Sequence, residues 1–115
     1  MIDLKIINLA ANTTNYGLKK NSTHYASCKN RICGDKIKVE VNSNGTIIKN
    51  MRYETESCIF CQASASLLSK KVKNIMITNL DKILFSKKFK SLLSRKYITR
   101  RECIMLPFEA LKKAL

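Results

Sequence analysis

A chain of 115 residues is long enough to bury one modest core, and its three glycines and one proline exclude a Gly- or Pro-rich linker, so a single domain over residues 1–115 is expected. Its 22 lysine and arginine residues against 8 aspartate and glutamate residues give a formal net charge of +14, which would attract nucleic acid, an anionic membrane or an acidic protein. Charge alone does not choose among these partners, because a lysine-rich chain that is also rich in Asn and Ile arises without selection for a partner.

The N-terminal stretch 4–12 is predicted to form a short amphipathic helix, with Leu4, Ile7 and Ala11 at helical spacing. Its apolar run is too short for the core of a signal peptide, and Asp3 stands where such a peptide would be basic. No later run approaches the roughly 20 apolar residues that cross a bilayer. We therefore expect a soluble, cytoplasmic protein with no membrane partner.

The middle of the chain has the alternating pattern of a β-hairpin. Ile37, Val39 and Val41 fall on one face of a strand predicted over residues 36–41, after an extended segment in HYASCKNRI. The sequence NSNG then supplies a turn, and residues 46–56 are predicted to return as the partner strand. This pattern predicts a small antiparallel sheet.

The second half of the chain is predicted to be helical. From Ile59 the apolar spacing changes from two to three and four, which indicates a helix packed on the sheet. A second helix is predicted over residues 78–94, and Pro107 is expected in the first turn of a last helix. The order of elements predicts an α+β fold in which helices cover one side of a small antiparallel sheet. The predicted core stripes are Phe60, Ala63, Ser64, Leu67, Leu68 and Val72 in the first helix, Leu80, Leu84, Phe85, Phe89, Leu92 and Leu93 in the second, and Phe108, Leu111 and Leu115 in the last.

Five cysteines in a reducing compartment favour metal binding or thiol chemistry over disulfides. Cys33 is followed by Gly34, which lets the backbone turn, and by Asp35, whose carboxylate can point to the same side as the thiol. A thiolate and a carboxylate placed in this way form an ion-binding pair.

Two further cysteines stand next to predicted helices. Cys58 comes just before one, where unpaired N–H groups and the helix dipole favour an anion, so its thiolate is expected to form readily. Cys103 is expected just before the last helix, beside Arg100 and Arg101. Three thiolates and a carboxylate suit tetrahedral zinc and equally suit an iron–sulfur cluster, with Asp35 as the hard ligand among soft ones.

Three stretches in this order resemble the IscU/NifU-type iron–sulfur cluster assembly scaffolds, including the SufU branch: CGD at 33–35, SCIFCQASASLL at 57–68 and RRECIMLPFEAL at 100–111. The resemblance covers nearly the whole chain and is strongest to the short bacterial NifU-like proteins. It implies the α+β fold, a transient iron–sulfur cluster or zinc as cofactor, a cysteine desulfurase as sulfur source and apo iron–sulfur proteins as acceptors. The ligands it implies are Cys33, Asp35, Cys58 and Cys103.

The chain also departs from the family's pattern. Glu102 stands where the family commonly has His or Lys, so it is a candidate further ligand that competes with Asp35. Cys61 stands where the family usually has a small residue, and both packing and a share in the metal or sulfur chemistry are open for it. KYITRRE replaces a Leu-Pro-Pro-Val-Lys stretch for a specialised Hsp70-type chaperone, so chaperone coupling is not expected.

The principal hypothesis is therefore a scaffold or carrier, not an enzyme. One alternative is a zinc-dependent persulfide sulfur-transfer protein of the SufU type, in which Cys58 accepts the persulfide sulfur. Another is a basic zinc-ribbon nucleic-acid binder built from Cys28-x4-Cys33 and Cys58-x2-Cys61. The ribbon leaves Cys103 and Asp35 without a role, and the basic residues are not interleaved with exposed aromatics, so no specific nucleic-acid partner is expected. Cys28 falls in the predicted extended segment and is assigned to packing.

Overall fold

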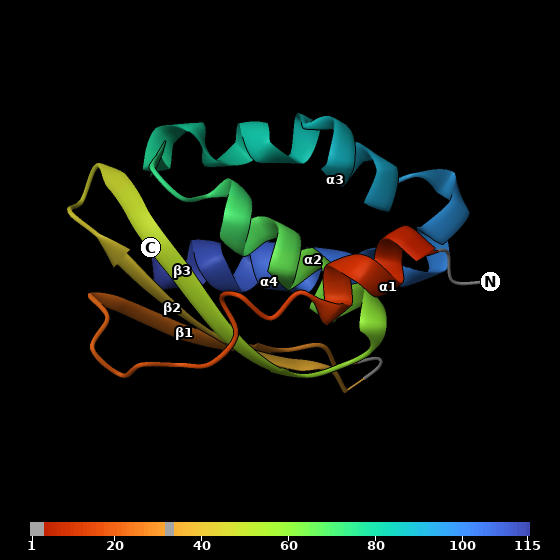
Figure 1. The fold of residues 1–115 in the computed structure, drawn as a ribbon, viewed down its shortest axis with the longest axis horizontal. Coiled ribbons are helices and arrows are strands. Elements are labelled where there is room, and N and C mark those ends of the chain that lie inside the picture. Colours follow the sequence, from red (N-terminus) through yellow and green to blue (C-terminus); the bar gives the residue numbers. More distant parts are fainter. Residues whose placement is uncertain (1–3, 32–33) are drawn as a thin grey trace.

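The computed structural model describes residues 4–31 and 34–115. A four-stranded antiparallel sheet in the order β1-β2-β3-β4 is covered on one face by helices (Figure 1), so the predicted α+β architecture is confirmed. The strands are β1 (His24–Lys29), β2 (Lys36–Ser43), β3 (Ile47–Glu56) and β4 (Ile75–Met76). The helical elements are α1 (Leu4–Ala11), α2 (Ile59–Lys71), the 3-10 helix η1 (Ile77–Phe85), α3 (Lys87–Leu92), the 3-10 helix η2 (Arg95–Arg100) and α4 (Arg101–Ala114).

The predicted hairpin is present, and its alternation sets which face is buried. β2 and β3 pair antiparallel, with Val39 opposite Tyr53 and Val41 opposite Met51. These four side chains and Ile37 are buried in the core. β1, the predicted extended segment, pairs with the other side of β2. β4 was not predicted, because two residues carry no alternation.

α2 is the helix around which the core is built. It packs on β3, α1 and α4, while η1 and α3 run over its side away from the sheet (Figure 1). Ala63, Ser64, Ala65 and Ser66 are all buried, and their small side chains let the neighbouring elements approach closely. The Ser64 hydroxyl donates a hydrogen bond to the backbone oxygen of Ile104 in α4. Burial therefore extends around the helix beyond the single predicted stripe.

The outer face of the sheet holds the loop that joins α1 to β1. Glu40 is buried there, and its Oε1 and Oε2 accept backbone N–H hydrogen bonds from Lys19 and Lys20 at 2.7 and 2.9 Å. Arg52, opposite Glu40 in the ladder, donates through Nε to the carbonyl of Gly17 at 2.6 Å. The buried carboxylate is thus satisfied by two backbone donors, as burial of a charge requires.

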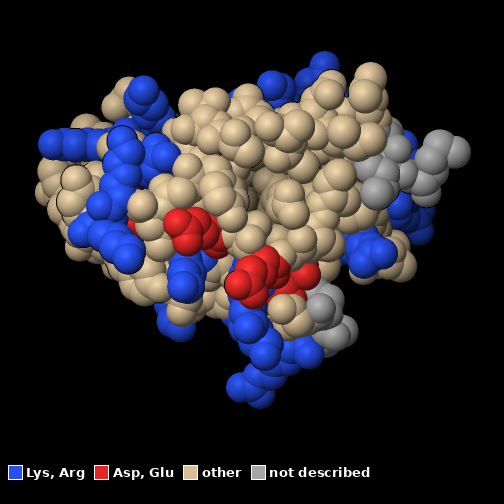
Figure 2. Space-filling model, turned by 60° about the horizontal axis from the view of Figure 1, so that its bottom comes forward, with Lys and Arg blue, Asp and Glu red and all other residues tan. Residues whose placement is uncertain are grey.

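Opposite charges face each other across the β2–β3 ladder. Figure 2, turned so that the lower side of Figure 1 comes forward, shows acidic side chains gathered among lysine and arginine. Opposite charges directly across two strands are favourable neighbours. The facing pairs are Lys36 with Glu56, Lys38 with Glu54, and Glu40 with Arg52.

The helix α1 is present as predicted, but the predicted buried face is wrong. Leu4 and Ile7 are 69% and 44% exposed, and Ala11 is also exposed. Ile6 is buried instead, with Leu9 half-buried beside it, because this side of the helix packs on α2. The eight residues of α1 contain two sets of apolar side chains at helical spacing, one with Leu4, Ile7 and Ala11 and one with Ile6 and Leu9. Only the contact with α2 decides which set is buried.

The single helix predicted over residues 78–94 is wrong, because the segment breaks at Ser86. Ser86 has extended backbone angles (φ −65°, ψ 151°), and it separates η1 from α3. A 3-10 helix repeats every three residues, so Leu80 and Ile83 share the buried side of η1. Phe85, predicted to be buried, is 71% exposed.

The last helix begins earlier than predicted. α4 starts at Arg101, so Cys103 lies in its first turn and Pro107 lies in its second. Phe108 and Leu111 are buried as predicted. α4 packs on α2, β1 and β2, and these contacts keep the helix continuous across Pro107. Lys113 near its end donates to the backbone oxygen of Ser27 in the edge strand β1 at 3.1 Å. Among the helices of the two described ranges, none has the length and apolar run needed to cross a bilayer.

The substitution Glu40→Gln should lower the free energy of unfolding by about 1–3 kcal/mol, measured by urea denaturation. The amide oxygen of glutamine can accept one of the two backbone N–H groups, but its NH2 group would meet the other donor. Glu56→Gln is the matched control, because Glu56 is exposed and its substitution should change stability by less than about 0.5 kcal/mol. Equal losses in the two variants would contradict this role of Glu40.

Candidate metal centre

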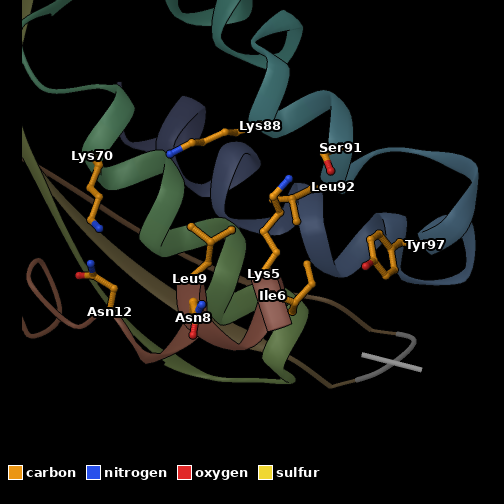
Figure 3. Close-up of a pocket in the computed structure, with 10 residues that line it drawn as sticks. All are labelled: Lys5, Ile6, Asn8, Leu9, Asn12, Lys70, Lys88, Ser91, Leu92 and Tyr97. Carbon is orange, nitrogen blue, oxygen red and sulfur yellow. The ribbon is translucent and has the colours of Figure 1, made fainter. Parts of the chain in front are cut away.

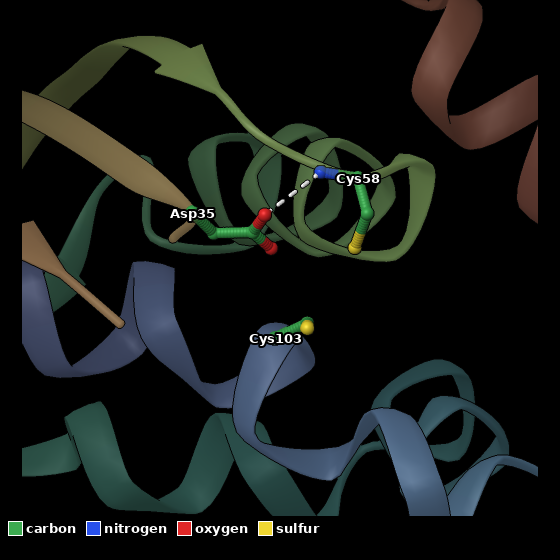
Figure 4. Close-up of side chains that lie close together, drawn as sticks. All are labelled: Asp35, Cys58 and Cys103. Carbon is green, nitrogen blue, oxygen red and sulfur yellow. Dashed lines mark hydrogen bonds between the residues drawn. The ribbon is translucent and has the colours of Figure 1, made fainter. Parts of the chain in front are cut away.

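Three side chains from distant parts of the chain converge at the N-terminal end of α2 (Figure 4). Asp35 directly precedes β2, Cys58 lies between β3 and α2, and Cys103 lies in the first turn of α4. Their candidate ligand atoms, one carboxylate oxygen and two sulfurs, all lie within 4.8 Å of one another. Asp35 and Cys103 are buried, whereas Cys58 is half-buried. We refer to these three residues as the triad.

The turn between β1 and β2 places Asp35. Gly34 has a φ of +77°, in the left-handed region that favours glycine. The N–H of Asn30 donates to the carbonyl of Asp35, and the N–H of Gly34 donates to the carbonyl of Asn30, both at 2.8 Å. These bonds close the turn and direct the Asp35 carboxylate toward Cys58.

The two oxygens of Asp35 have different surroundings. Oδ1 accepts a hydrogen bond from the backbone N–H of Cys58 at 3.2 Å (Figure 4). Oδ2 is buried and receives no hydrogen bond from any residue within 4–31 or 34–115. A buried acceptor left without a partner costs free energy unless a cation or a donor satisfies it. Oδ2 is therefore suited to coordinate a metal beside the two thiols.

Cys58 is the N-cap residue of α2. Its backbone is extended (φ −70°, ψ 165°), and its side chain makes no cap hydrogen bond, so the sulfur can face the other two residues of the triad (Figure 4). Gln62 donates through Nε2 to the carbonyl of Ser57 at 3.0 Å, and this bond holds the backbone in place just before α2. The positive end of the helix dipole at this position favours an anionic group.

A positively charged side chain lies close to the first turn of α2. The Arg100 guanidinium sits over the Phe60 ring, 5.6 Å from its centroid, and Phe60 in turn contacts the ring of Tyr97 at 5.3 Å. Arg100 was predicted to lie beside Cys103, and it is the N-cap residue of α4, three residues before it. The contact with Phe60 was not predicted, because no local pattern relates residues 40 positions apart.

Of the four predicted ligands, the structure brings together the three of the triad. Cys33 lies outside the described residues, so its ligand role stays a prediction. Glu102 is exposed on α4, and Cys61 is fully buried in the core, as a packing role predicts. Within the described ranges, the triad is the one group of three or more His, Cys, Asp or Glu side chains that could hold a metal, and neither residue belongs to it.

The arrangement of the triad does not support the zinc-ribbon alternative. It requires Cys28 and Cys61 as ligands, but Cys28 is half-buried in β1 opposite Ile37 and packs against the core. The ribbon leaves Cys103 and Asp35 without a role, whereas the structure places both of them beside Cys58.

Residues 2–115 match the protein family described as NifU-like N terminal domain. The zinc-dependent sulfurtransferase SufU of Bacillus subtilis (strain 168) is 30% identical over 53 residues, which is 46% of this chain and 36% of that protein. The matched segment therefore spans little more than a third of this curated relative.

Two solved structures share the fold over nearly the whole chain. The N-terminal part of a nitrogen-fixing NifU-like protein from Brucella abortus has a TM-score of 0.82 and 18% identity, covering 97% of this chain and 90% of that one. A putative iron–sulfur cluster assembly scaffold protein for the SUF system from Fervidobacterium islandicum AW-1 has a TM-score of 0.78 and 20% identity, covering 98% and 95%. At these identities the likeness establishes the fold.

In the native protein, iodoacetamide should alkylate Cys58 at least about tenfold faster than Cys61, as measured by mass spectrometry of quenched time points. Cys58 is half-buried, whereas a fully buried thiol reacts only after an opening that costs free energy. In denaturant the two rates should become similar. Equal rates in the native protein would show that Cys61 is not enclosed in the core.

Proposed function

The chain belongs to the NifU-like N terminal domain family, and from this we propose that it is an iron–sulfur cluster assembly scaffold that loads its cargo on the triad. The observation that carries the proposal is the convergence of two thiols and a carboxylate within 4.8 Å, with one carboxylate oxygen buried and available. Cys33, two residues before Asp35, is the proposed fourth ligand.

The donor set suits a cargo that has to be held and then released. Thiolates are soft ligands that suit both zinc and iron–sulfur clusters, whereas the Asp35 carboxylate is hard and contributes less to holding either one. Once deprotonated, the thiolates and the carboxylate would together carry a net negative charge. The Arg100 guanidinium, which lies over Phe60 in the first turn of α2, and the N-terminal end of α2 are two positive groups that can offset this charge.

We propose that sulfur enters through Cys58, the most accessible residue of the triad. The Cys58 thiolate attacks the outer sulfur of a persulfide on a cysteine desulfurase, and a new S–S bond forms on Cys58. The S–S bond of the donor breaks, and the donor cysteine leaves as a thiolate. Building a cluster from this sulfur also requires iron from a donor and a reductant that supplies two electrons per sulfur, because persulfide sulfur has to be reduced to sulfide. The finished cluster then passes to an apo iron–sulfur acceptor protein.

A second candidate function uses the same residues with a different cargo. The curated relative from Bacillus subtilis is named a zinc-dependent sulfurtransferase, which favours zinc bound at the triad and sulfur carried on Cys58. In that case the protein would act as a sulfur-transfer enzyme, and the cluster would be built elsewhere. The two candidates differ in cargo and share the site.

Metal content distinguishes the two candidates. After anaerobic purification, a scaffold should carry iron and sulfide and absorb in the visible range. A zinc-dependent transferase should be colourless with one zinc per chain. Neither iron nor zinc at stoichiometric level, before or after reconstitution, would contradict both.

Replacing Cys33, Cys58 or Cys103 by Ser should each weaken metal or cluster binding by at least about tenfold. Loss of a residue that merely supports a ligand already costs about 10–100-fold, so loss of a ligand should cost no less. Cys28→Ser is the matched control and should bind normally, because Cys28 packs against the core outside the triad. If Cys28→Ser abolished binding while Cys103→Ser kept it, the ligand assignment would be wrong.

Asp35→Ala should still load its cargo, while handover to an apo-acceptor becomes about tenfold slower, equivalent to about 1.4 kcal/mol on the barrier. A hard ligand contributes little to retention, but it can leave and open a coordination position for the acceptor's thiol. Loading stoichiometry and transfer rate are measured on the same preparation.

Asp35→Asn separates the ligand role from the structural one, because its amide oxygen can still accept the Cys58 N–H hydrogen bond. It should transfer as slowly as Asp35→Ala. If Asp35→Asn transferred at the wild-type rate, the effect of Asp35→Ala would come from the lost hydrogen bond instead. Failure of both variants to load would also refute the proposed role in release.

A further inference from the structure

A cavity of about 220 Å³ opens between α1, α2 and α3 (Figure 3). Its apolar lining comes from Ile6 and Leu9 of α1, Leu92 of α3 and Tyr97 of η2. Three of these four side chains are buried and Leu9 is half-buried, so the cavity has a fixed apolar floor. None of the residues that line it belongs to the triad.

Three lysines from three different elements surround this floor. Lys5 comes from α1, Lys70 from the last turn of α2 and Lys88 from α3, and all three are exposed (Figure 3). The described residues that line the cavity include no aspartate or glutamate. The opening is therefore positively charged in a chain that already carries a net charge of +14.

The volume limits what can enter. At about 220 Å³, the cavity is smaller than the roughly 300–1,000 Å³ of pockets that take drug-sized ligands. One large apolar side chain fits this size. An apolar pocket that takes one side chain inside a polar rim is the usual anatomy of a protein-binding hot spot.

We propose that this cavity docks an acidic segment of a partner protein, which inserts one large apolar side chain between α1, α2 and α3. The carboxylates on either side of that anchor lie against Lys5, Lys70 and Lys88. The apolar floor distinguishes this surface from one that tracks a phosphate backbone, because phosphates gain nothing from buried aliphatic side chains. Lys70 and Lys88, from the lysine-rich stretches KKVK (70–73) and KKFK (87–90), thus acquire a role that net charge alone did not give them.

The cavity is joined to the first turn of α2 by one ring contact. Tyr97, which lines the cavity, contacts Phe60, two residues after Cys58. A segment docked here would lie against α2, the helix whose N-cap residue is Cys58. The inference goes beyond the proposed function and does not depend on the cargo, so its test uses the metal-free protein.

The probe is a helical peptide of about 18 residues with one central Leu and Glu residues one turn to either side of it. Binding is followed by NMR chemical shifts of the backbone amides at physiological salt. Shifts should be confined to α1, the end of α2, α3 and the part of η2 around Tyr97. Changing the peptide's Leu to Ala should weaken binding by at least about tenfold, because the anchor loses its buried surface.

Matched variants of the protein test the lysine rim. Lys88→Glu should weaken binding by about fivefold or more. Lys87→Glu makes the same charge change on the neighbouring, exposed residue of α3 that does not line the cavity, and should change binding by less than about twofold. Ser91→Phe, which places a ring at the cavity wall, should abolish the effect of the peptide's Leu.

Three outcomes would overturn the proposal. The first is equal binding of the Leu and Ala peptides, or equal effects of Lys87→Glu and Lys88→Glu, which would mean attraction by net charge alone. The second is no detectable binding of the Leu peptide at millimolar concentration. The third is the same pattern of shifts produced by a single-stranded oligonucleotide of equal charge, which would assign the surface to nucleic acid.

Discussion

The hydrogen bond from the backbone N–H of Cys58 to Oδ1 of Asp35 joins the turn before β2 to the start of α2. α2 packs on β3, α1 and α4, so the position of its first turn affects where these three elements can lie. The same carboxylate leaves its second oxygen buried beside the two sulfurs of the triad. One side chain therefore connects the geometry of the fold to the chemistry of the candidate site.

The elements that the sequence predicted well are those whose pattern is local. The alternation of Ile37, Val39 and Val41 predicted the buried face of β2, and the change of spacing at Ile59 predicted the start of α2. The buried face of α1 and the break at Ser86 could not be predicted, because both depend on which surface the segment packs against. Pro107 misled the prediction of α4, because a proline can also lie inside a helix that its neighbours hold in place.

The candidate site was more predictable than the packing around it. Asp35, Cys58 and Cys103 were selected from residue type and position beside turns and helix ends, and the structure brings these three together. The sequence left Cys61 open between packing and chemistry, and its burial in the core follows from the tight enclosure of α2. The placement of Arg100 over Phe60 and of three lysines around one cavity depends on contacts between distant segments, which a single sequence does not display.

The hydrogen bond between Lys113 and Ser27 bears on whether copies of the protein associate with one another. β1 lies at an edge of the sheet, and the outward carbonyls of an edge strand can pair with a strand of another molecule and start aggregation. The Lys113 ammonium already occupies the carbonyl of Ser27, and the exposed Lys29 places a further positive charge on the same strand. A strand of another copy that approached β1 would meet both of these cations, and the net charge of +14 on each copy adds repulsion. Lys113, near the C-terminal end of α4, thus opposes strand-to-strand association at this edge of the sheet.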